Sequence, residues 1–134
     1  MSLLIGAVKH GKLVVRLHSG DPALYGAINE QIAYLTAQGV DVEVVPGVTA
    51  ALAAAAALKR ELTTPELTQT VIITRLPGRT MVPEKEQLKL LAKSQSTLCL
   101  YLSATKAKEA EEQLLTAYPP ATPVALVYKA SQPQ

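Results

Sequence analysis

The sequence predicts an α/β protein built from two small α/β halves with largely parallel sheets. Short apolar runs, among them residues 12–19 and 69–74, alternate with segments whose apolar residues recur at helical spacing. Two apolar runs end in turns that lead directly into a helical pattern, Ser19-Gly20-Asp21-Pro22 and Pro46-Gly47-Val48-Thr49. Because parallel strands need a long crossover, most often a helix, both observations favour parallel pairing.

The first half of the chain carries clear helix boundaries. Asp21 is a suitable N-cap, and Pro22 suits the first position of a helix, where no N–H is needed. Gly39 is a suitable end for the same helix. Thr49 can cap an alanine-rich segment of high helix propensity. We therefore expect helices at residues 3–10, 23–38 and 50–59 and strands at residues 12–19 and 40–45.

The second half repeats the alternation. Pro83 is placed to begin a helix, and Pro119 and Pro120 end the last helical pattern. The helical pattern is interrupted around Pro65, so we place a boundary at residues 63–67 and expect domains at residues 1–66 and 67–134. In this half we expect strands at residues 69–74, 97–102 and 123–129 and helices at residues 83–92 and 103–118.

Composition excludes several classes of function. The 134 residues carry a net charge of only +2, the basic residues are scattered, and there is no Phe or Trp, so a nucleic-acid partner is not expected. The longest apolar stretch, residues 48–58, is about half a membrane span, and the start has no basic segment typical of a signal peptide. The single Cys99 lies in an apolar run and is interpreted as a structural thiol. We expect a cytoplasmic protein without a membrane partner.

The usual catalytic motifs are absent. No Cys/His cluster has metal-binding spacing, so no protein-bound metal is expected. Ser19 lacks the glycines of a hydrolase nucleophile elbow, and no P-loop is present. Instead, several predicted strands end in small or polar residues, as at Ser19-Gly20-Asp21, Thr49-Ala50 and Leu102-Ser103. Such ends can hold a flexible cofactor for a reaction that depends on alignment, but a simple connector explains the Gly20 turn about equally well.

Two segments resemble the tetrapyrrole (corrin/porphyrin) methylases. The segment at residues 16–26, RLHSGDPALYG, is similar to the family's Gly-Asp-Pro motif, and VVPGVTA at residues 44–50 is similar to its second motif. Further segments resemble the branch of the family that methylates carbon 11 of precorrin-4: ELTQTVI at residues 66–72, GRT at 78–80, VPE at 82–84 and PVALVYKAS at 123–131.

The resemblance implies S-adenosylmethionine as methyl donor and precorrin-4 or cobalt-precorrin-4 as acceptor, in cobalamin biosynthesis. It also implies a homodimer of two-domain subunits, with the donor bound between the domains. Carried over by motif, the donor-binding residues are Ser19, Gly20, Asp21, Leu24, Thr49, Ala50, Leu102 and Ala130. No catalytic residue is assigned. Weaker candidates for binding the acceptor's carboxylates are Arg16, His18, Arg75 and Arg79. A surface or interdomain salt bridge is an equal alternative for the arginines, and a loop role is an equal alternative for His18.

The sequence departs from the family at both ends. The first strand with its Gly-Pro-Gly-Asp-Pro loop is not present, and the chain stops soon after Ser131, where the family continues. We therefore expect an incomplete fold. The alternative function is a non-catalytic fragment that acts as a ligand-binding or assembly module.

Overall fold

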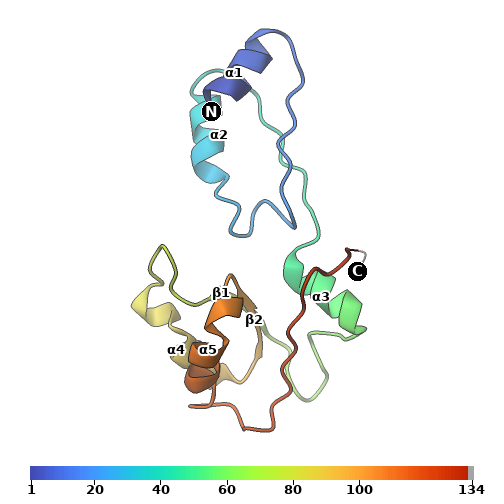
Figure 1. Cartoon of the computed structure of the whole chain (residues 1–134), viewed down its shortest axis with the longest axis vertical. Coiled ribbons are helices and arrows are strands. Elements are labelled where there is room, and N and C mark those ends of the chain that lie inside the picture. The colour runs from blue at the N-terminus through green and yellow to red at the C-terminus, as the bar shows by residue number, and fades with distance from the viewer. Residues whose placement is uncertain (133–134) are drawn as a thin grey trace. The chain divides into compact units, whose positions relative to one another are not determined.

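The computed structural model describes residues 1–132, and the chain divides into two compact units that meet between Ala54 and Ala55. Unit 1 contains helices α1 (Ser2–Lys9) and α2 (Asn29–Thr36), and helix α3 (Ala50–Leu58) runs from unit 1 into unit 2 (Figure 1). The division between the units falls within α3, before the boundary expected at residues 63–67. The domain bounds 1–66 and 67–134 stay a prediction.

The predicted strands of unit 1 are wrong. Residues 12–18 and 40–48 are extended, but within the described chain no strand ladder joins them to each other or to another segment. Leu13, Val15 and Leu17 have the alternation of a strand, yet they are 93%, 70% and 89% exposed. An extended segment becomes a strand only when a neighbour satisfies its backbone groups, and these segments have no such neighbour.

The helix expected at residues 23–38 is correct only in its second part. Residues 22–25 form a turn instead, and the helix begins at Asn29. Tyr25 and Ala27 have positive φ angles of 56° and 51°, a conformation that an α-helix cannot contain. The helices expected at residues 3–10 and 50–59 are confirmed as α1 and α3.

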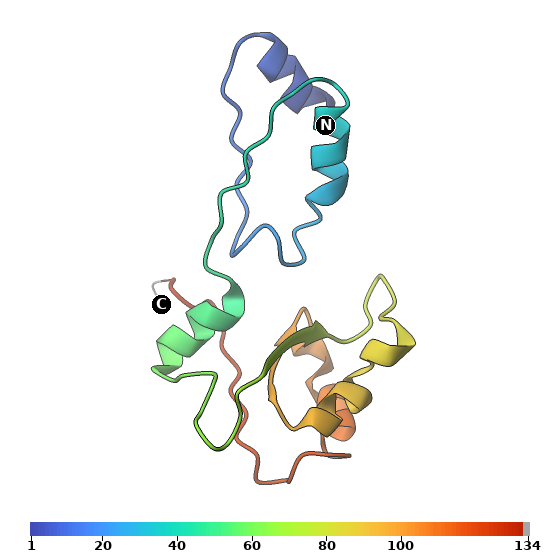
Figure 2. The same ribbon diagram turned by 180° about the vertical axis from the view of Figure 1, so that it is seen from behind.

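Unit 2 contains a small parallel sheet, which confirms the predicted pairing class. Strand β1 (Val71–Arg75) pairs with strand β2 (Thr97–Tyr101), and Arg75 lies opposite Tyr101 at the carboxyl ends (Figure 2). The strand expected at residues 123–129 is wrong: the segment is not part of a sheet, and Val124, Leu126 and Tyr128 are 80–85% exposed.

Two helices of unit 2 are shorter than the sequence predicts. Gln87, with ψ 139°, separates a 3₁₀ turn from helix α4. Lys106, with ψ 26°, is the last residue of a second 3₁₀ turn and directly precedes helix α5. Neither ψ is α-helical, so neither helix extends back through these residues. The segments are η1 (Glu84–Glu86), α4 (Leu88–Leu91), η2 (Ala92–Ser94), η3 (Ala104–Lys106) and α5 (Ala107–Leu114). Leu76, Leu88 and Ala110 form the buried core of this unit, against which Leu98, Leu100 and Leu114 pack.

Candidate functional site

The carboxylate of Asp21 joins the two motif turns of unit 1. One carboxylate oxygen, Oδ1, accepts a hydrogen bond from the backbone N–H of Ala23 at 2.8 Å. The other, Oδ2, accepts one from the backbone N–H of Gly47 at 2.9 Å, across 26 residues of chain. The first bond shapes the turn after Gly20, and the second ties that turn to the Pro46-Gly47 turn. We call this arrangement the Asp21 joint.

The two turns approach each other so closely that glycine is required on one side. A Cβ atom added to Gly47 would lie 2.2 Å from the carbonyl oxygen of Gly20, much closer than real Cβ atoms come. Gly20 itself has φ 74°, which side chains disfavour, and its Cα faces the backbone of residues 48–50. The surface of the joint is therefore formed by backbone groups of both turns.

The two backbone N–H groups also set the charge of Asp21. The bond from Gly47, and then the bond from Ala23, lower the pKa of the Asp21 carboxyl below its ordinary value, because both stabilise the charged form. Asp21 is thus an anion at neutral pH, with both oxygens engaged by backbone. Its carboxylate serves to hold the two turns together.

The remaining donor-binding candidates of unit 1 lie beside the joint in the chain. Thr49 is buried, and its carbonyl oxygen accepts the backbone N–H of Ala53 at 3.0 Å, inside the first turn of α3. Ala50 is the first residue of α3, Leu24 is half-buried, and Ser19 is exposed. The structure therefore brings Gly20, Asp21, Thr49 and Ala50 together, although the sequence placed them in two separate motifs.

Leu102 and Ala130, the other two donor-binding candidates, belong to unit 2. Leu102 directly follows β2, has φ 54° and is 77% exposed, whereas Ala130 is half-buried. Ser103 secures this end of the sheet: its hydroxyl accepts the buried N–H of Leu76 at 2.9 Å and donates to the carbonyl of Tyr101 at 2.7 Å. The assignment of Leu102 and Ala130 to a donor site stays a prediction.

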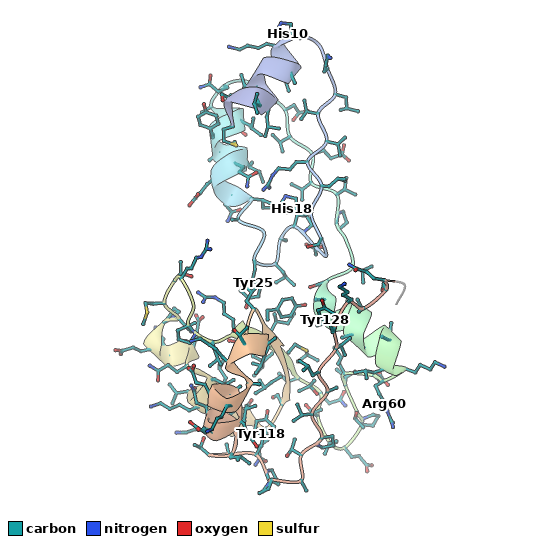
Figure 3. The ribbon with its side chains drawn as sticks, viewed as in Figure 1. His10, His18, Tyr25, Arg60, Tyr118 and Tyr128 are labelled. Atoms are coloured by element: carbon teal, nitrogen blue, oxygen red, sulfur yellow. The ribbon has the colours of Figure 1, made fainter. Side chains whose placement is uncertain are left out.

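The four candidates for acceptor binding have different environments. His18 lies on the extended segment before Gly20 (Figure 3). Arg16 donates from Nη1 to Nε2 of His18 at 2.6 Å. An arginine cannot accept a hydrogen bond, so Nε2 of His18 is the acceptor in this contact. Arg75 and Arg79 belong to unit 2, where Arg75 bonds to its own loop and Arg79 is exposed.

Two residues important to this geometry, Gly47 and Ser103, were not among the predicted site residues. The signal for Gly47 was present, since a Pro-Gly pair after a predicted strand marks a tight turn. Ser103 was expected only as a small or polar residue at a strand end and as a cap for the following helix.

The described chain also contains hollows away from the joint. One of about 380 Å³ in unit 1 is lined by Pro22, Ala23 and residues 25–30, and does not include Gly20 or Thr49. Within residues 1–132, no helix is both long and apolar enough to cross a membrane, and no three His, Cys, Asp or Glu side chains gather as a metal-ligand group.

Comparison with known proteins identifies close relatives. The chain is 53% identical over 131 residues to the cobalt-precorrin-4 C(11)-methyltransferase of Priestia megaterium, covering 97% of this chain and 51% of the relative. It is 47% identical over 133 residues to the precorrin-4 C(11)-methyltransferase of Pseudomonas aeruginosa, covering 99% and 53%. The chain therefore spans about half the length of the curated relatives it matches.

Solved structures agree with these relatives. The X-ray structure of a cobalt precorrin-4 methyltransferase, a cobalamin biosynthetic enzyme, matches 98% of this chain and 56% of its own, with a TM-score of 0.95 and 52% identity. The uroporphyrin-III C-methyltransferase of Thermus thermophilus, complexed with S-adenosyl homocysteine, matches 86% of this chain and 49% of its own, with a TM-score of 0.67 and 28% identity.

The sequence pattern of the Tetrapyrrole (Corrin/Porphyrin) Methylases matches residues 2–134, nearly the whole chain. This match includes both turns that Asp21 joins. The chain belongs to the tetrapyrrole (corrin/porphyrin) methylase family.

Proposed function

We propose that this chain is part of an S-adenosylmethionine-dependent methyltransferase that methylates carbon 11 of precorrin-4 or cobalt-precorrin-4 in cobalamin biosynthesis. The names of relatives at 47% and 53% identity support the acceptor and the methylated carbon. A solved relative complexed with S-adenosyl homocysteine, the product of the donor, supports the donor. The single structural observation that carries the proposal is the Asp21 joint, which ties the two motif turns together.

The residues at the joint suit a donor of this kind. Gly20 and Gly47 add no side chains, so a ligand can approach the backbone closely, and the start of α3 follows at Ala50. When bound, a sulfonium donor supplies an already activated methyl group. The chain then needs to hold and orient the donor and exclude water, which requires no acid or base. Gly20, Thr49 and Ala50 would hold it, and Asp21 would keep the two turns at the right separation.

Calorimetry on the 134-residue chain with S-adenosylhomocysteine tests the donor assignment. The two aspartates give a matched pair of variants. Asn at position 21 keeps only one acceptor oxygen, so Ala23 or Gly47 loses its partner, whereas Asp41 is exposed and makes no hydrogen bond within the described chain. Asp21→Asn should bind several-fold more weakly, and Asp41→Asn should bind as the parent chain does. No binding by the parent chain, or equal binding by both variants, contradicts the proposed role of the joint.

Transfer of a labelled methyl group to precorrin-4 tests the reaction itself. Turnover supports the methyltransferase function. Donor binding without turnover supports the second candidate, a binding module that does not catalyse. The exposed extended segments of both units favour that candidate for the chain alone, because they leave apolar surface uncovered.

We also propose that the protein acts in the cytoplasm as a homodimer. The homodimer is what the family resemblance implies. Sedimentation analysis at several concentrations measures the mass. A monomer at every concentration contradicts the dimer.

A further inference from the structure

The guanidinium group of Arg75 holds the loop at residues 76–82 through four hydrogen bonds. Nη1 donates to the carbonyls of Leu76 at 3.2 Å and Thr80 at 3.1 Å. Nη2 donates to the Thr80 hydroxyl at 2.8 Å and to the carbonyl of Met81 at 3.1 Å. The two ends of the loop are thereby tied to one planar group at the carboxyl end of β1.

This use of Arg75 leaves little of its donor capacity for a ligand. Both Nη atoms are occupied by acceptors that belong to the loop itself. The loop also has an internal bond, from the N–H of Gly78 to the carbonyl of Thr80 at 3.2 Å. Arg75 therefore acts on the loop's conformation.

Arg79 is the contrasting residue on the same loop. It is exposed, and within residues 1–132 its side chain makes no hydrogen bond or ion pair. A fixed loop lowers the entropy lost when such a side chain binds a ligand. Arginine is also suited to bidentate binding of a carboxylate.

The surroundings of the loop favour a ligand with carboxylate groups. A hollow of about 320 Å³ lies against it, and Arg79 is not in its lining. The residues that line it are Arg75, Pro77, Met81, Val82, Gln87, Leu88, Lys89 and Gln113. No acidic side chain is in this lining. Apolar walls with cationic and amide groups suit an arm that has methylene groups and a terminal carboxylate.

We propose that Arg75 is a positioning residue that holds the loop 76–82 in the conformation from which Arg79 binds a carboxylate of the acceptor. The second part rests on the proposed function, since it takes the acceptor to be a polycarboxylate macrocycle. The first part concerns only the loop.

Hydrogen exchange tests the first part without a ligand. Arg75→Ala should speed exchange of the hydrogen-bonded amides of Leu76 and Gly78 by about tenfold or more, because the loop that carries them loses four bonds. Arg75→Lys should not restore protection, because one ammonium cannot reproduce a fork across these acceptors. Thr80→Val removes one acceptor only and should give a smaller increase, with global stability retained. Unchanged exchange in all three variants overturns the positioning role.

Binding of uroporphyrin III, a macrocycle with eight carboxylates, tests the second part. Arg79→Ala should weaken its binding to the full chain about tenfold. Arg79→Lys should recover only part of the affinity, because it keeps the charge but not the bidentate fork. Both variants keep the loop intact. Arg60→Ala is the matched control: it removes the same charge from unit 2, where exposed Arg60 follows α3 and its side chain makes no hydrogen bond within the described chain (Figure 3).

The outcomes separate the two ideas. Equal affinities of Arg79→Ala and Arg60→Ala for uroporphyrin III overturn the role of Arg79. If the parent chain does not bind uroporphyrin III at all, both the Arg79 role and the polycarboxylate acceptor fail, while the exchange result still decides the role of Arg75. All these variants should bind S-adenosylhomocysteine with the same affinity. If the parent chain does not bind S-adenosylhomocysteine, only the proposed function fails.

Discussion

Replacing Gly47 with alanine tests the close approach of the two motif turns. The added Cβ atom would lie 2.2 Å from the carbonyl oxygen of Gly20 and 3.1 Å from its carbonyl carbon. Real Cβ atoms essentially never come within 3.0 Å of such atoms, so the turns must separate by about 0.8 Å or more. A movement of this size lengthens the 2.9 Å bond between Gly47 and Asp21 beyond hydrogen-bonding distance.

The expected cost follows from the forced displacement. Overpacking that shifts backbone costs about 1–3 kcal/mol of folding free energy. If the same distortion must be reversed when the donor binds, the affinity for S-adenosylhomocysteine falls by about 5- to 150-fold. Both effects have one cause, so they should appear together.

Chemical denaturation and calorimetry on the full chain measure the two effects. Gly6→Ala is a matched control in unit 1, because nothing lies within 4 Å of its added Cβ atom. Gly6 lies within α1, where alanine should stabilise the chain by about 0.5–1 kcal/mol. The two glycine-to-alanine changes should therefore have opposite signs. A Gly47→Ala chain as stable and as tight-binding as its parent would refute the close approach.

Three further predictions concern single groups. Folding lowers the pKa of the Asp21 carboxyl, so the Asp21 joint should persist at pH values above 3.8, the ordinary pKa of this residue, and should be lost as the pH falls further. The amide proton shift of Gly47 should follow this titration, and it should not do so in Asp21→Asn. Ser103→Ala should lower the free energy of unfolding by about 1–3 kcal/mol, because the buried N–H of Leu76 loses its partner, whereas exposed Ser94→Ala should change it much less; equal effects in denaturation would count against this bond. Burial raises the pKa of the half-buried Cys99 thiol, so at pH 8 Cys99 should react with Ellman's reagent more slowly than in the denatured chain, and equal rates would contradict its burial.

The parallel sheet of unit 2 was predictable because its two strands are continuous apolar runs that pair with each other. Their pattern in the sequence favours extended segments, and the helical pattern between them favours parallel pairing, as the structure has it. The strands expected at residues 12–19 and 123–129 have comparable patterns, yet their apolar side chains are exposed. The apolar pattern of a segment favours an extended backbone, but the segment becomes a strand only when a neighbouring segment pairs with it.

The sequence selected the residues of the two turns but did not indicate that Asp21 connects them. Two turns rich in glycine and small residues indicated a ligand surface, and the motif resemblance selected Gly20, Asp21, Thr49 and Ala50. The local sequence suggested Asp21 as a helix cap, and its bond to Ala23 fits that interpretation in part. The bond to Gly47 joins residues 26 apart, and no local pattern reports such a contact.

Arg75 shows a different limit of sequence interpretation. A cation at a strand end suggested either a ligand carboxylate or a salt bridge. In the structure its four bonds go to acceptors of its own loop. Backbone carbonyls are present at every position, so the sequence cannot indicate which of them a guanidinium will bind.

The most direct test of the central claim is a titration of the ¹⁵N-labelled chain with S-adenosylhomocysteine, followed by NMR. If the donor binds at the turns that Asp21 joins, the amide signals of Gly20, Gly47, Thr49 and Ala50 should shift together and saturate with one dissociation constant. Amides that line the hollow at residues 25–30, or that lie in α1, should shift much less. Saturable shifts confined to those other regions, or no saturable shift at any amide, would contradict the account.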